Sequence, residues 1–167
     1  MLKGECYPSS SSPSVPGDPA TWIFMDDLSP DNLKAAVKAC HSFVTRFTEV
    51  EARFTCDYGD YLSFGDVLLD KAKKLKFEMQ INIEDEPEIF YIHNGDKVVL
   101  DYEKIADNTY EVKGEVQLLS DEYQWIRFGV NTLDGNFRFY GNPITKGKKI
   151  PDIKTFGQAR EALGIEI

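Results

Sequence analysis

Hydrophobic and polar residues recur with two different periods along this chain. Between Pro30 and Phe47 the apolar residues return every three or four positions, which places them on one face of a helix. Ser29 and Pro30 are typical of a helix start, because Ser caps the first free amides and Pro lacks the N–H that would stay unbonded. The pattern predicts a helix over residues 30–47, preceded by a short apolar strand over residues 21–25.

After this helix the period becomes two. Val50, Ala52, Phe54 and Cys56 alternate with Glu49, Glu51, Arg53 and Thr55. Such alternation predicts strands with one apolar face and one charged face. It is interrupted once, where Ser63 and Asp66 resemble a capping pair and predict a second, shorter helix that ends near Leu75.

The rest of the chain is predicted to be mainly β. Asn94-Gly95 and Asp134-Gly135 are typical of hairpin turns, because these residues tolerate positive φ. The predicted strands cover residues 77–83, 88–93, 97–102, 110–118, 123–130 and 136–140. A last helix is predicted over residues 153–163, with Gly164 as its stop.

Together these elements predict an α+β fold. We expect an antiparallel meander of about six strands, packed with two N-terminal helices and one C-terminal helix. Residues 1–19 are rich in Ser and Pro and poor in apolar groups, which predicts a disordered tail. Residues 20–167 are of the length of a single domain.

Charge and cysteine content narrow the classes of function. The chain has 28 acidic and 19 basic residues and a net charge of −9, so we expect no direct binding to nucleic acid. No apolar run is long enough to cross a membrane, and the N-terminus lacks the apolar core of a signal peptide. The three cysteines have no disulfide-framework spacing, so the expected location is the cytoplasm.

Motifs for catalysis, cofactors and metals are missing from the sequence. It has no glycine-rich phosphate loop, no nucleophile elbow and no Cys or His pair at zinc spacing, so we expect no cofactor and no metal. One nucleophile–base pair stays open, because Cys56 and His93 would meet if their strands were paired. The sequence as a whole favours a protein that is not an enzyme.

The most informative pattern is that acidic residues recur on the charged faces of strands and beside tyrosines. Tyrosine is enriched in interfaces, and an acidic surface attracts a basic partner. We therefore interpret the chain as a non-enzymatic acidic protein-binding module, such as an immunity or inhibitor protein that masks a basic, nuclease-like partner. The predicted partner-binding residues are Glu49, Glu51, Asp57, Tyr58, Asp60, Tyr61, Glu111 and Glu115.

Two other functions remain open. A curved sheet could enclose a small-molecule or catalytic pocket, lined by Phe77, Phe90, Tyr91, Trp125, Phe128, Phe137 and Phe139. The Ser/Pro-rich tail and acidic charge also suit an exported bacterial effector or a secretion chaperone. A lesser candidate surface is basic and consists of Lys146, Lys148, Lys149 and Lys154. Oligomeric state is not indicated by any of these patterns.

Overall fold

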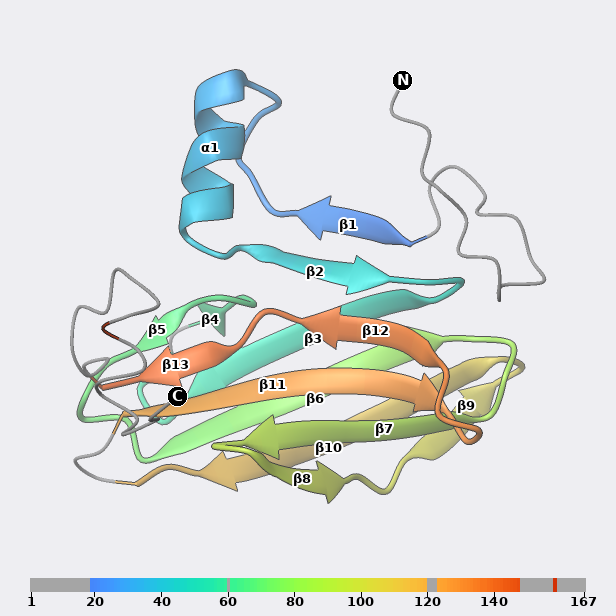
Figure 1. The fold of residues 1–167 in the computed structure, drawn as a ribbon. Helices are drawn as coiled ribbons and strands as arrows, with labels where there is room; N and C mark the ends of the chain where they lie inside the picture. The colour runs from blue at the N-terminus through green and yellow to red at the C-terminus, as the bar shows by residue number, and fades with distance from the viewer. Residues whose placement is uncertain (1–18, 60, 120–122, 148–157, 159–167) are drawn as a thin grey trace.

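Two β-sheets packed face to face make up most of the structure (Figure 1). The computed structural model describes residues 19–59, 61–119, 123–147 and 158. We call the eight-stranded sheet around β11 (Gln124–Thr132) sheet A and the five-stranded sheet around β6 (Lys74–Asn82) sheet B. The architecture is therefore a β-sandwich.

Sheet B is antiparallel, with strand order β4-β3-β6-β10-β9. Its other strands are β3 (Glu49–Cys56), β4 (Tyr61–Leu62), β9 (Glu103–Ala106) and β10 (Thr109–Gln117). The three long strands alternate as the sequence predicts, with inward residues buried and outward residues mostly exposed. Sheet B therefore has one wet face, and charged side chains cover it.

Sheet A is built around β11, which pairs with β7 on one side and with β12 and β13 in succession on the other. Its remaining strands are β1 (Ala20–Ile23), β2 (Ser42–Thr45), β5 (Val67–Leu68), β7 (Pro87–His93), β8 (Asp96–Val99), β12 (Phe137–Gly141) and β13 (Ile144–Lys146). Beyond β12 the sheet continues through β2 to β1, which is its last strand (Figure 1). Only the β5–β13 pair is parallel among the described pairings.

The core lies between the two sheets and is dominated by aromatic rings. Phe128 of sheet A lies 5.1 Å from Phe54 and 4.9 Å from Phe77, both of sheet B, measured between ring centroids. Phe139 joins them through Phe64, whose ring is 5.5 Å away. Each of these five side chains is at most 4% exposed, so the rings join the two layers into one hydrophobic core.

The predicted α+β meander is wrong, because the apolar faces of two sheets cover each other and helices are not needed for that purpose. Consecutive strands also do not stay in one sheet. The chain passes from β6 in sheet B to β7 and β8 in sheet A, returns to sheet B for β9 and β10, and crosses again to β11. Strand alternation identifies an apolar face but does not say which surface will cover it.

The first predicted helix is correct at its start and wrong at its end. In α1 (Pro30–Lys38), the Oγ of Ser29 accepts a hydrogen bond from the N–H of Asn32 at 3.2 Å, so the predicted cap is confirmed. Cys40 then has a φ of 60°, which terminates the helix. The following residues form β2 because they pair with β1 and β12, and this tertiary pairing outweighs their helical spacing.

The second predicted helix is also wrong. The N–H of Ser63 donates to Asp66 Oδ2 at 2.7 Å, so the capping contact forms, but it closes a turn and not a helix. Gly65 within this turn has a φ of 91°, and Val67–Leu68 then pairs with β13. The backbone carbonyl of Cys40 lies 2.2 Å from the position that a Cβ on Gly65 would take, so only glycine fits this contact.

Both predicted hairpins are confirmed. Asn94 and Gly95 have φ values of 52° and 105° and join β7 to β8, and the loop containing Gly135 joins β11 to β12. The predicted tail and the predicted helix over residues 153–163 lie outside the described residues, apart from Pro19 and Gln158.

We expect Gly65→Ala to lower the free energy of unfolding by about 2–4 kcal/mol, because it adds a steric clash to an unfavourable φ. Gly135→Ala is the matched control, since Gly135 has a similar φ of 87° but no atom within 4 Å of its Cβ position. The control should cost about 1 kcal/mol. Urea unfolding followed by circular dichroism measures both, and equal losses would contradict the packing role of Gly65.

Candidate functional site

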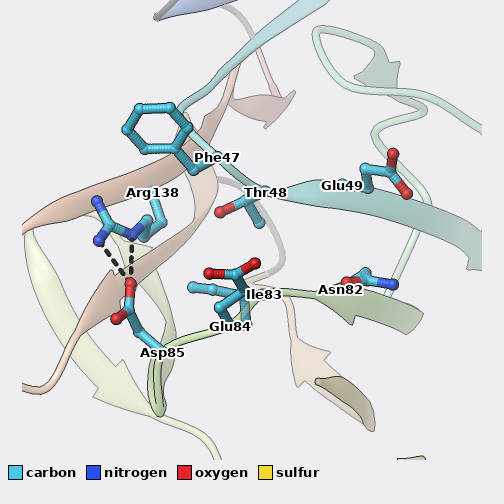
Figure 2. A pocket seen from close by; sticks show the side chains of 8 residues that line it. All are labelled: Phe47, Thr48, Glu49, Asn82, Ile83, Glu84, Asp85 and Arg138. Atoms are coloured by element: carbon cyan, nitrogen blue, oxygen red, sulfur yellow. Dashed lines mark hydrogen bonds and ion pairs between the residues drawn. The ribbon is translucent and has the colours of Figure 1, made fainter. Parts of the chain in front are cut away.

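A cleft opens at one end of the sandwich, where the β2–β3 corner faces the β6–β7 connection (Figure 2). Its volume is about 520 Å³. The residues that line it are Phe47, Thr48, Glu49, Asn82, Ile83, Glu84, Asp85 and Arg138. A smaller hollow of about 140 Å³ shares Glu49 and Asn82 with this cleft and extends it along sheet B to Glu51. The two hollows are therefore neighbours at this end of sheet B.

The β2–β3 corner presents an aromatic ring to solvent. Phe47 is 65% exposed and has a φ of 50°, a conformation that a bulky residue adopts only when its surroundings impose it. The N–H of Arg46 donates to the carbonyl of Arg138 at 2.7 Å, and the Oγ1 of Thr48 donates to the carbonyl of Arg46 at 3.0 Å. These contacts fix the corner on both sides of Phe47 and hold its ring outward.

An ion pair joins the two walls of the cleft on the side of Phe47 (Figure 2). The Nε and an Nη atom of Arg138 donate to Asp85 Oδ2 at 3.1 and 2.6 Å (Figure 2). The Arg138 side chain is 16% exposed, and it lies where the register between β11 and β12 shifts. The pair therefore connects the β6–β7 connection to β12, and it neutralises Asp85.

Three other carboxylates at this end have no such partner. Glu49, Glu51 and Glu84 make no ion pair within 4.0 Å in the described part of the chain. We call these three residues the acidic end. Across the sheet from Glu51 the register places the neutral Gln80, then Glu111, and then Glu103 of β9, so the acidic end is continued by polar and acidic residues.

The other end of the same face is electrically balanced. Lys113 Nζ lies 3.1 Å from Glu78 and 3.0 Å from Glu111, and Lys74 Nζ lies 2.8 Å from Glu115. Hydrogen bonds to Glu111 and Glu78 raise the pKa of Lys113, and the hydrogen bond from Lys74 lowers the pKa of Glu115. These carboxylates are therefore satisfied within the chain, in contrast to the acidic end.

The eight predicted partner-binding residues are thus divided between two places. Glu49, Glu51, Glu111 and Glu115 all lie on the outer face of sheet B, but only the first two belong to the acidic end. Asp57 follows β3 at its far end, roughly 26 Å from Glu49 by strand geometry. Asp60 lies outside the described residues.

Asp57 and Tyr58 connect loops near the balanced end. Asp57 Oδ1 accepts hydrogen bonds from the N–H groups of Lys73 and Lys74 at 3.0 and 3.3 Å. The hydroxyl of Tyr58 donates to the carbonyl of Lys71, and the Lys71 ammonium lies 4.2 Å from the centroid of its ring. Tyr61 is 85% exposed, but it borders a hollow that also contains Arg53, Lys76 and Lys113 and is therefore not acidic.

The other two candidate sites from the sequence are the Cys56–His93 pair and the basic surface around Lys146. Cys56 is in sheet B and His93 in sheet A, so their strands do not pair, and His93 Nε2 instead donates to Gln124 Oε1 at 3.0 Å. Lys146 is 2% exposed and donates to the carbonyl of Leu119, so it is not a surface cation. Lys148, Lys149 and Lys154 lie outside the described residues.

The aromatic residues that the sequence suggested as the lining of a small-molecule pocket do not surround a common cavity. Phe77, Tyr91, Phe128 and Phe139 belong to the core or pack against it. Phe90 contacts Tyr140 on the outer face of sheet A, at a centroid distance of 5.9 Å, and Phe137 stacks on the same Tyr140 at 5.3 Å. In the described ranges no group of three or more His, Cys, Asp or Glu residues is arranged to hold a metal ion.

Sequence reasoning missed Phe47, Glu84 and the Asp85–Arg138 pair. Phe47 was assigned to the predicted helix, although Val44 and Thr45 before it are β-branched and favour a strand. Glu84 and Asp85 fall in the acidic break before Pro87, which marks the end of a strand but not the cleft beside it. No local sequence pattern identifies Arg138 as a site residue, because its partner Asp85 lies 53 positions away in the sequence.

Phe47→Gly should raise the free energy of unfolding by about 1 kcal/mol, because glycine accepts a positive φ without steric cost. Phe47→Ala is the matched control, since alanine removes the ring but keeps the strain. Urea unfolding of the three proteins measures the difference. A Phe47→Gly variant no more stable than Phe47→Ala would show that this corner is not strained.

Asp57→Asn should destabilise the protein at neutral pH, and the difference from the unsubstituted protein should shrink in acid. Partial desolvation raises the pKa of Asp57, but the amide donors of Lys73 and Lys74 outweigh it and hold the pKa below the ordinary 3.8. A lowered pKa adds stability above the unfolded-state value, and this stability is lost as pH falls through the folded-state value. Thermal unfolding of both proteins between neutral and acid pH tests this, and a constant difference would contradict it.

Comparison with known proteins adds no relative from which a role could be inferred. No family model matches the chain, and no curated protein or solved structure is significantly similar to it. No helix in the described part of the chain is long and apolar enough to cross a membrane.

Proposed function

We propose that this protein is a non-enzymatic binding module that uses its acidic end to bind a basic partner protein. The observation that carries the proposal is a contrast within one sheet face. Within the described residues Glu49 and Glu51 have no cationic partner, whereas Glu78 and Glu115 on the same face are paired with lysines. Within the described residues, the chain therefore pairs some carboxylates of this face with lysines and leaves Glu49 and Glu51 without a cation.

The unpaired carboxylates carry a small electrostatic cost in the free protein. Glu49 and Glu51 are two residues apart on the same strand face, about 7 Å by strand geometry. Two like charges at that separation in water repel by about 0.6 kcal/mol. A Lys or Arg side chain placed between them would remove this repulsion and gain attraction to both, so binding of a cationic group is favoured at this position.

The extent of the surface favours a polypeptide over a single small cation. A row of polar and acidic residues runs from Glu51 through Gln80 and Glu111 to Glu103 across four neighbouring strands, about 14 Å at the usual strand spacing, and Lys113 pairs with Glu111 within it. Phe47 lines the cleft together with Glu49 and has its ring exposed, although the guanidinium of Arg46 lies 5.7 Å from the ring centroid. Aromatic rings attract cationic side chains as well as apolar ones. A basic segment with a hydrophobic or arginine anchor would fit both features.

A nuclease-like protein is the partner class that suits this surface best. Its phosphate-binding groove is basic, and the net charge of −9 would steer the two proteins together. Masking that groove would inhibit the partner, which is the action of an immunity or inhibitor protein. A cytoplasmic location belongs to the same proposal, since Cys40 and Cys56 are both free thiols, as a reducing compartment would keep them.

The proposal predicts that Glu49→Gln combined with Glu51→Gln weakens binding to a ten-residue arginine peptide by about fivefold at low salt. Two exposed ion pairs of about 0.5 kcal/mol each account for this factor. The matched control combines Glu78→Gln with Glu115→Gln, which changes the net charge equally on the same face. It should change the affinity less than about twofold.

Isothermal titration at about 50 and about 300 mM salt measures the affinities of all three proteins. Equal losses in the two double variants would mean that only net charge matters, which would contradict a site at the acidic end. Phe47→Ala should also weaken peptide binding. No loss in that variant would remove the aromatic anchor from the proposal.

A further inference from the structure

The helix α1, the one helix with defined bounds in the described part of the chain, is mostly exposed to solvent. Of the nine residues of α1, only Ala36 is buried, while Leu33 and Val37 are 40% and 55% exposed. An isolated helix of this length is not stable in water, because too few hydrogen bonds offset the cost of nucleation. Leu33 and Val37 are four residues apart and share one face of the helix, so an apolar stripe is left exposed by the described part of the chain.

The strand beside this helix is a sheet edge to which no other described strand is paired. β1 pairs with β2 on one side, and no described strand pairs with its other side (Figure 1). Natural proteins usually protect such edges with charged residues or short strands. The other outer strands follow this rule: β8 and β9 each carry an acid and a lysine, and β4 and β5 have two residues each. The four residues of β1, Ala-Thr-Trp-Ile, include no charge.

Two aromatic side chains on this edge are both exposed and held in place. Trp22 is 56% exposed, but its ring stacks on Phe43 at 6.2 Å and its Nε1 donates to Thr45 Oγ1 at 3.0 Å. Phe24 is 44% exposed and lies 5.4 Å from the same Phe43. Because both rings are ordered before any contact is made, little side-chain entropy would be lost on binding.

The exposed apolar area on β1, α1 and the segment that connects them is close to what a stable dimer needs. Two half-exposed aromatic rings contribute about 200 Å², and the aliphatic side chains Leu28, Leu33 and Val37 add about as much. Apolar atoms supply about 60% of an interface, so about 400 Å² per chain corresponds to roughly 1,300 Å² over two chains. That area lies within the range of specific protein–protein interfaces.

We propose that a second copy of this chain covers this surface, with β1 of one copy pairing antiparallel with β1 of the other about a twofold axis. The arrangement joins two copies of sheet A into one continuous sheet and satisfies the free edge of each. An uncharged edge is also where two chains of net charge −9 repel each other least. The acidic ends take no part in this contact, so dimerisation and partner binding are independent.

Sedimentation velocity of the full chain over a range of concentrations tests the proposal, and it should show a reversible dimer. Trp22→Lys places two like charges at the twofold axis and should weaken the dimer by on the order of 100-fold or more. Val99→Lys is the matched control, because Val99 is 58% exposed on β8 at another edge of the same sheet. The control should leave the dimer unchanged.

Val37→Lys on α1 provides a second variant that does not touch the sheet, in case Trp22→Lys fails to fold. It too should weaken the dimer, by about tenfold. A protein that stays monomeric up to millimolar concentration would overturn the proposal, as would a dimer that neither variant weakens. Protection of the β1 amides from hydrogen exchange in a monomer would show that the chain's own flanking residues cover the edge, and would also overturn it.

Discussion

The structure depends on the mutual burial of two apolar sheet faces. Each face alone would be exposed, and neither has a helix over it in the described residues. A fully buried side chain such as Phe54 or Phe128 contributes about 1.5–3 kcal/mol, so the inner faces dominate the stability of the fold. This burial also fixes the register, because a slip of one residue in β6 would place Glu78 where Met79 now lies.

The register that fills the core also determines the surface. With Met79 and Ile81 directed inward, Glu78 must face outward beside Lys113, and Gln80 must separate Glu51 from Glu111. Which carboxylates are neutralised therefore follows from where lysines fall on β6 and β10. β6 carries Lys74 and Lys76 at its start and β10 carries Lys113 at its middle. Lys74 and Lys113 therefore pair with Glu115, Glu78 and Glu111 and do not reach Glu49 and Glu51.

Local patterns predicted local features well. Alternation from Val50 onward correctly placed Glu49 and Glu51 on one outer face, and Asn94-Gly95 correctly placed a hairpin. What failed depended on distant partners. The segment Ser42–Thr45 is a strand because it pairs with β1 and β12, and the Ser63–Asp66 turn cannot become a helix because Gly65 packs on the Cys40 carbonyl. The cleft likewise needs Arg138 beside Asp85, which no local pattern contains.

The pairing of β2 with β12 has a consequence for how the chain is made. The side chain of Asn142 donates to the carbonyl of Cys40, across 102 positions of sequence. β2 therefore cannot complete its ladder until most of the chain has left the ribosome, and closing so long a loop is entropically slow. During synthesis the Trp22 edge would stay exposed the longest, so it is the segment most available to chaperones and to premature association.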